Sequence, residues 1–290
     1  MKDLISDLFE TKAVKACEAN NPFWLTSGKI GTYFINAEFL YGSGDESAAL
    51  LTMIDEELQN RDTLPKKVFE KVLEQYNTNE IYKRVIDAIK ETIDQNIDVD
   101  KIDFISGGER RDWVFSNIIA YILKKPHITI FKDLETLVSD SDFSVTKPID
   151  TLEGKKVLHL SDLITEAASY ITAWVPTIEK LGGKMEATIT IVDRMQGGSA
   201  KLTECGVKTY PLVKVNKDLF KIALEKGRIT PEQYKMVDAY MNNPDETMRE
   251  FLIAHPEFIE NSLKGTGKTL IRVKKCIDED LYKLGDMLKN

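Results

Sequence analysis

The sequence predicts an α/β fold built on a doubly wound parallel sheet. Short apolar segments typical of buried strands occur at 102–106, 127–131, 157–161 and 187–193. Stretches with helical spacing of apolar residues separate them, at 113–123 and 169–181. Strands buried on both faces and alternating with helices indicate a parallel sheet with right-handed crossovers. Ligands bind at the C-terminal ends of such strands, so the residues that follow each strand are the candidates for function.

The first hundred residues predict helices with one strand pair between them. Apolar residues recur at helical spacing in 66–76 and in 81–93, where Ile81, Val85, Ile86, Ile89 and Ile93 share one face. Residues 24–36 lie between an N-terminal helix and these two helices. Their pattern is that of a strand, a glycine turn and a second strand.

The chain is again helical after about residue 215. Thr230-Pro231-Glu232-Gln233 has the pattern of a capping box with proline at the first helical position, and Asn243-Pro244-Asp245-Glu246 repeats it. We therefore expect a main domain over residues 1–215 and a mainly helical C-terminal extension over residues 216–290.

Residues 132–153 follow the second strand and show little periodicity. A loop of this length in a compact α/β domain is most often a lid over the site, so a lid is our expectation. A surface insertion without function is the alternative.

Composition excludes several classes of protein. Of the 290 residues, 39 are Lys or Arg and 47 are Asp or Glu, a net charge of −8, which argues against non-specific binding of nucleic acid. The sequence has neither an apolar run long enough for a membrane helix nor an N-terminal signal-peptide pattern. Its three cysteines are scattered, which fits a cytoplasmic protein and provides no metal-binding framework. We expect neither a nucleic-acid nor a membrane partner, and no metal held by the chain's own side chains.

The segment from Val157 to Ser169 is the strongest candidate for a binding site. A buried strand ends at Ser161-Asp162, and a short loop of small and hydroxylic residues leads into a helix. Backbone N–H groups at such a helix start attract a phosphate, small side chains let it approach, and Asp162 could accept sugar hydroxyls. An ordinary strand-to-helix turn with an N-cap is the alternative.

This segment resembles the 5-phosphoribosyl 1-pyrophosphate (PRPP) motif of the type I phosphoribosyltransferases. Other segments, in the family's order, resemble its orotate phosphoribosyltransferase branch: 23–29 with 33–36, 107–113 and 192–198. The resemblance implies a phosphoribosyltransferase-like domain with a small N-terminal hood, a homodimer, and Mg²⁺ as cofactor. It also implies that PRPP and an orotate-like base are the small-molecule substrates.

The resemblance further assigns roles to individual residues. PRPP or its phosphate would be bound by Arg111, Asp162, Thr165, Glu166, Ala167, Ala168 and Ser169. The base would be bound by Lys29, Tyr33, Phe34 and Arg194, and Asp162 and Lys132 would act in catalysis.

The chain departs from the family pattern at several of these positions. Ser161 replaces the first acid of the motif, Glu166 replaces the second threonine, and Ala167 and Ala168 replace two glycines. Glu135 stands where the family's lid has its catalytic lysine. The resemblance implies transfer of a phosphoribosyl group from PRPP to a pyrimidine-type base in nucleotide biosynthesis. The departures leave open a catalytically impaired protein that binds a nucleotide or another phosphorylated ligand.

Overall fold

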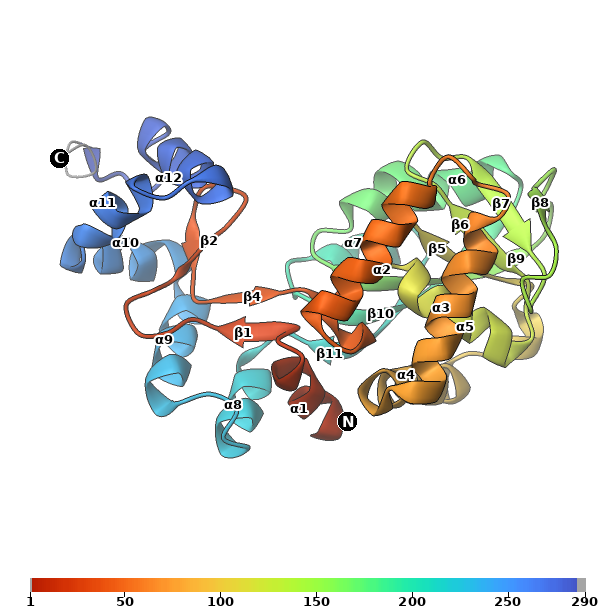
Figure 1. Ribbon diagram of the computed structural model, residues 1–290, viewed down its shortest axis with the longest axis horizontal. Coiled ribbons are helices and arrows are strands. Elements are labelled where there is room, and N and C mark those ends of the chain that lie inside the picture. Colours follow the sequence, from red (N-terminus) through yellow and green to blue (C-terminus); the bar gives the residue numbers. More distant parts are fainter. Residues whose placement is uncertain (1, 286–290) are drawn as a thin grey trace. The chain divides into compact units, whose positions relative to one another are not determined.

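The computed structural model describes residues 2–285, which form two compact units (Figure 1). One unit comprises residues 2–13 and 37–215, and the other comprises residues 14–36 and 216–285. The first unit ends at Val215, and residues 14–36 group with the C-terminal helices rather than with the sheet. The expected division into residues 1–215 and 216–290 stays a prediction.

A seven-stranded sheet with the order β11-β10-β9-β5-β6-β7-β8 forms the centre of the first unit. The strands are β5 (Phe104–Gly108), β6 (His127–Ile130), β7 (Thr136–Ser139), β8 (Thr146–Pro148), β9 (Lys156–Ile164), β10 (Lys184–Asp193) and β11 (Lys208–Lys214). The five strands from β11 to β6 are parallel to one another, and β7 and β8 continue the sheet antiparallel. The predicted doubly wound α/β fold is confirmed.

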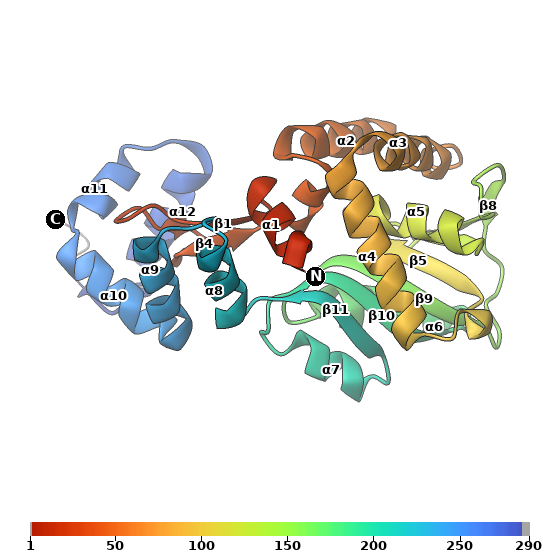
Figure 2. The ribbon, with the colours of Figure 1, turned by 90° about the horizontal axis from the view of Figure 1, so that it is seen from below.

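Helices cover both faces of the sheet (Figure 2). One face carries α4 (Glu80–Asn96) and α5 (Trp113–Leu123), and the other carries α6 (Val175–Lys180) and α7 (Gly198–Glu204). The π-helix η3 (Tyr170–Trp174) directly precedes α6. The chain winds one way from β5 to β6 and the opposite way from β9 through β10 to β11. This reversal creates a switch point between the C-terminal ends of β5 and β9, where a parallel sheet opens a crevice.

The remaining elements of this unit complete the packing around the sheet. They are α1 (Lys2–Glu10), η1 (Ala37–Tyr41), α2 (Gly44–Glu57), α3 (Leu64–Thr78) and the short η2 (Val99–Lys101). The predicted helices at 66–76 and 81–93 correspond to α3 and α4.

The segment expected to be a lid instead contains two strands. Along β7 the buried side chains of Leu137 and Ser139 alternate with half-buried ones, which is the period of a strand packed on one face. Phe143, in the turn between β7 and β8, is buried and stacks on Phe69 with 4.6 Å between ring centroids. Much of this segment is therefore an edge of the sheet with its own apolar anchor.

The second unit joins the residue 14–36 strands to the C-terminal helices. Its strands are β1 (Val14–Ala16) paired with β4 (Tyr33–Ile35), and β2 (Phe23–Trp24) paired with β3 (Ile30–Gly31). Its helices are α8 (Lys217–Glu225), α9 (Pro231–Asn242), α10 (Pro244–Ala254), α11 (Glu257–Leu263) and α12 (Gly267–Asp278). Ile30 packs in one cluster with Met248, Val273 and Tyr282, so strands and helices share a core.

The predicted helix starts in this unit are confirmed. Thr230 and Gln233 form the reciprocal capping box of α9, and the Asn243 side chain accepts a hydrogen bond from the Glu246 N–H at the start of α10. Among residues 2–285, no helix has the length and apolarity that a membrane crossing requires.

Candidate functional site

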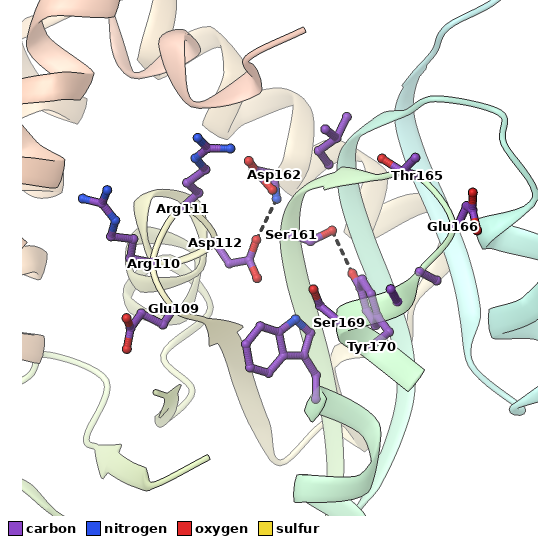
Figure 3. A pocket seen from close by; sticks show the side chains of 14 residues that line it. Glu109, Arg110, Arg111, Asp112, Ser161, Asp162, Thr165, Glu166, Ser169 and Tyr170 are labelled. Carbon is purple, nitrogen blue, oxygen red and sulfur yellow. Dashed lines mark hydrogen bonds between the residues drawn. The ribbon is translucent and has the colours of Figure 1, made fainter. Parts of the chain in front are cut away.

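A cleft of about 650 Å³ lies at the switch point of the sheet (Figure 3). One side is the turn that follows β5, and the other is the end of β9 with the loop that leads into η3. It is lined by Glu109, Arg110, Arg111, Asp112, Ser161, Asp162, Leu163, Thr165, Glu166, Ala167, Ala168, Ser169, Tyr170 and Trp174. All seven residues predicted to bind PRPP or its phosphate are among them.

The loop formed by residues 165–169 presents unpaired backbone amides. Within the described part of the chain, none of the backbone N–H groups of residues 166–169 donates a hydrogen bond. Ala167 adopts a left-handed conformation with φ of 59°, and its side chain is buried. Several unpaired N–H groups in succession at a strand-to-helix turn are suited to bind an anion.

Gly198, the first residue of α7, holds this loop in place. Its N–H donates to the Thr165 carbonyl oxygen at 3.1 Å. A Cβ at this position would lie 2.7 Å from the same oxygen and 3.0 Å from the Ala167 nitrogen, so the contact requires glycine. Gly198 lies in the segment 192–198 that resembles the family, but no role was predicted for it.

Glu166 lies at the outer edge of the loop, with its carboxylate turned away from Ser169 and Tyr170 (Figure 3). The carboxylate pairs with Lys201 Nζ at 3.5 Å, and both side chains are well exposed. Glu166, which replaces a threonine of the family motif, therefore has its negative charge partly offset by Lys201.

Asp112 connects the two sides of the cleft. Its carboxylate accepts one hydrogen bond from the Gly108 N–H at 3.1 Å and another from the Asp162 N–H at 2.9 Å (Figure 3). Asp112 is 7% exposed, and His159 Nε2 lies 3.5 Å from its Oδ2. No role was predicted for Asp112 from the sequence, although it lies in the turn between a predicted strand and a predicted helix.

Asp162 is surrounded by other carboxylates. Burial raises its pKa well above the ordinary range of aspartate, and the nearby charges of Asp112 and Glu38 act in the same direction. Arg111 opposes the shift. Asp162 consequently retains its proton at pH values where an exposed carboxyl group has lost it, and a protonated carboxyl group both donates and accepts hydrogen bonds.

The two arginines in the cleft already have carboxylate partners. Arg111 pairs at 3.2 Å with Glu38, a buried residue of η1. Arg110 pairs at 2.8 Å with Asp55 of α2 and donates a hydrogen bond to the Leu51 carbonyl oxygen. An anionic ligand has to compete with these carboxylates for the arginine side chains.

Two buried contacts shape the floor of the cleft. The Tyr170 hydroxyl donates to Ser161 Oγ at 2.7 Å and lies 2.7 Å from Thr188 Oγ1. Trp174 lies against Gly108, where a Cβ would come within 2.4 Å of the indole ring. Ser161, which replaces an acid of the motif, is thus part of a neutral hydroxyl network.

Two further residues with predicted roles are not among those that line the cleft. The exposed Lys132 follows β6, and its backbone N–H donates to the Glu109 carboxylate at 2.9 Å. Arg194 follows β10, and its N–H donates to the Ile164 carbonyl oxygen at 2.9 Å. Its Nε is buried and has no hydrogen-bond partner among the described residues. The sheet therefore places Arg194 beside the loop but outside the cleft.

Glu135, at the position of the family's catalytic lysine, also pairs away from the cleft. Arg61, between α2 and α3, forms ion pairs with both Glu135 and Asp133, the second at 2.7 Å. The Arg61 guanidinium also lies over the Phe131 ring, 4.5 Å from its centroid. These contacts hold the turn between β6 and β7 against the loop that precedes α3.

The three residues of the second unit with predicted base-binding roles take part in the packing of that unit. Lys29 pairs with Asp245 at 2.7 Å. Tyr33 is buried, and its ring centroid lies 5.0 Å from that of Phe220. Phe34 meets Phe23 edge to face, with 4.9 Å between ring centroids.

The Mg²⁺ implied by the family resemblance stays a prediction. Among residues 2–285, no three His, Cys, Asp or Glu side chains converge in a way that could hold a metal ion. The carboxylates of Asp112 and Glu38 are instead engaged with backbone N–H groups and with Arg111, respectively.

Comparisons with known proteins agree with this fold. No protein-family model matches the sequence. The chain is 31% identical over 90 residues to an orotate phosphoribosyltransferase from Sulfolobus acidocaldarius, a match that covers 31% of this chain and 45% of that enzyme. It is 30% identical over 142 residues to an adenine phosphoribosyltransferase from Pelagibacter ubique, covering 44% of this chain and 80% of that enzyme.

A solved structure supports the same assignment at the level of the fold. The structure of Leishmania donovani UMP synthase superimposes with a TM-score of 0.57 at 16% identity, over 83% of this chain and 42% of that chain. The cleft, the sheet topology and these similarities lead to one conclusion: the chain belongs to the type I phosphoribosyltransferase family.

Proposed function

We propose that the cleft binds the 5-phosphoribosyl group of PRPP and that the protein transfers this group to a pyrimidine-type base, as an orotate phosphoribosyltransferase does. The observation that carries the proposal is the run of unpaired backbone N–H groups over residues 166–169, beside Asp162 in one cleft. The amides would bind the 5′-phosphate, and Asp162 would bind the ribose hydroxyls.

The chemistry requires one bond exchange at the ribose. A ring nitrogen of the base bonds to C1 while the bond from C1 to the pyrophosphate oxygen breaks, and the nitrogen releases its proton. Positive charge develops on the ribose in such a step, so the negative charge of Asp112 near the sugar site would favour it. Arg111 would face the departing pyrophosphate after separating from Glu38.

Binding without turnover is the second candidate, and specific contacts favour it. Lys132 does not line the cleft, Glu135 is paired with Arg61, and Arg111 is paired with Glu38. In this case the protein would bind a nucleotide or another phosphorylated ligand on the same loop.

Calorimetry and a turnover assay distinguish the two candidates. PRPP with Mg²⁺ is titrated into the protein, and orotate consumption is followed by its absorbance. Binding with turnover supports the transferase, while binding without turnover supports the second candidate. The absence of binding to both PRPP and a pyrimidine nucleotide contradicts both.

A further inference from the structure

Asp112 lies where the two halves of the cleft meet, and its carboxylate contacts both of them. It follows β5 in sequence, while Asp162, which it contacts, lies near the end of β9. One carboxylate oxygen accepts the Gly108 N–H and the other accepts the Asp162 N–H. The side chain thereby fixes the spacing between the turn after β5 and the end of β9.

Burial is the largest cause of the raised pKa of Asp162, and the charge of the Asp112 carboxylate adds to it in the same direction. The charged groups around Asp162 are Asp112 and Arg111 in the turn after β5 and Glu38 in η1. The Tyr170 hydroxyl faces the same region from η3, and both Asp112 and Asp162 raise the Tyr170 pKa. Two carboxylates and one guanidinium next to Asp162 leave a negative balance, which favours a proton on Asp162.

A buried histidine lies beside the Asp112 carboxylate. His159 on β9 is fully buried, and its Nδ1 lies 2.9 Å from Ser106 Oγ. Its Nε2 lies 3.5 Å from Asp112 Oδ2 and has no closer polar partner among residues 2–285. The imidazole ring therefore limits how far the carboxylate can withdraw from the cleft.

We propose that Asp112 is a positioning residue for ligand binding, which joins the two sides of the cleft and orients Asp162 toward the ribose hydroxyls. This inference rests on the proposed function for the identity of the ligand. The effect of Asp112 on the pKa of Asp162 is independent of the proposed function, because it can be measured in the ligand-free protein.

The experiment compares Asp112→Asn with a matched variant at the opposite end of the same two strands. Asp103 directly precedes β5, and its carboxylate accepts the Lys156 N–H at 2.9 Å, so it makes the same kind of cross-strand contact far from the cleft. Asp103→Asn controls for the structural effect of losing such a contact. Glu109→Gln removes one negative charge from the cleft lining without touching Asp162.

The first measurement is a carbon-13 NMR titration of the aspartate carboxyl groups, with the Asp162 signal assigned from Asp162→Asn. In Asp112→Asn, the Asp162 signal should titrate at clearly lower pH than in the wild-type protein. It should move little in Asp103→Asn and less in Glu109→Gln than in Asp112→Asn. An Asp162 titration unchanged in Asp112→Asn overturns the inference.

The second measurement is PRPP affinity by calorimetry. Asp112→Asn should weaken binding roughly tenfold or more, because one of two N–H groups loses its charged acceptor. Asp112→Glu retains the charge but displaces it by one methylene group, so it should keep the high titration of Asp162 and still bind PRPP more weakly. If Asp112→Asn fails to fold, Asp112→Glu still allows the positioning role to be tested.

The outcomes distinguish a failure of the positioning role of Asp112 from a failure of the proposed PRPP binding. Affinities for PRPP that are equal in Asp112→Asn, Asp112→Glu and Asp103→Asn overturn the positioning role. If the wild-type protein binds no PRPP, the proposed function fails, and the titration alone decides whether Asp112 controls Asp162.

Discussion

Gly198 provides the sharpest test of how the phosphate loop is held. In Gly198→Ala, the new methyl group would lie 2.5 Å from Ile164 Cγ2 and 2.7 Å from the Thr165 carbonyl oxygen. Because one of these neighbours is backbone, the loop itself has to shift. Overpacking of this kind costs about 1–3 kcal/mol, which corresponds to a decrease in Tm of roughly 2–4 °C per kcal/mol for a domain of this size.

The matched control is Gly206→Ala. Gly206 has φ of +75°, and a Cβ there would meet no atom within 4 Å. The control therefore suffers only the backbone strain of a left-handed residue, about 1 kcal/mol. Thermal denaturation should show that both variants lose stability, while calorimetry with PRPP should show weaker binding in Gly198→Ala alone. Wild-type affinity in a folded Gly198→Ala protein would refute the role given to the loop.

Three more predictions follow from individual side chains. Glu166→Gln should increase PRPP affinity severalfold, since a carboxylate at the loop costs on the order of 1 kcal/mol in anion binding; calorimetry showing no gain counts against phosphate at this loop. The raised pKa of Asp162 means that the folded protein holds a proton that the unfolded chain releases, so stability should fall as pH rises above the ordinary aspartate range toward the raised pKa. Urea unfolding across this range should show a flatter profile for Asp162→Asn, and parallel profiles would contradict the shift. Of the three thiols, only the exposed Cys205 should react quickly with a thiol reagent, because burial raises the pKa of Cys17 and Cys276 to about 11; fast labelling that persists in Cys205→Ser would be inconsistent with this.

Strands of the sheet could be predicted from the sequence where they are buried, because buried strands are rich in apolar residues. The strands β5, β6, β9 and β10 are mostly buried and are rich in apolar residues. The strand β11 was missed because it lies at the edge of the sheet, carries Pro211 and begins and ends with lysine. Proline is tolerated on an edge strand, where one side of the backbone has no ladder partner.

Most of the predicted cleft residues lie in one continuous segment, and the family resemblance added Arg111 from the turn after β5. Residues 161–169 form one strand end and one loop, so their small size and position indicated a binding site. Glu38 and Asp112 come from other elements, and only the order of the strands brings them to Asp162. Their contribution depends on packing that no local pattern reveals.

The role of an aromatic residue in the second unit could not be decided from the sequence. The expected contact of Tyr33 with a base stays a prediction, and its ring is buried beside Phe220 and Tyr240. These partners lie about two hundred residues away, in helices whose packing face could not be assigned from the sequence. An aromatic residue on a short strand serves equally well in a core or in a binding site, and its neighbours decide between them.

The most direct test of the account is a titration of the nitrogen-15-labelled protein with ribose 5-phosphate, followed by backbone amide NMR. The account predicts saturable shifts of the amide signals of Glu166, Ala167, Ala168 and Ser169, whose N–H groups have no partner in the ligand-free protein. Shifts confined to other parts of the molecule, or none at millimolar ligand, would contradict the claim that this loop binds a sugar phosphate.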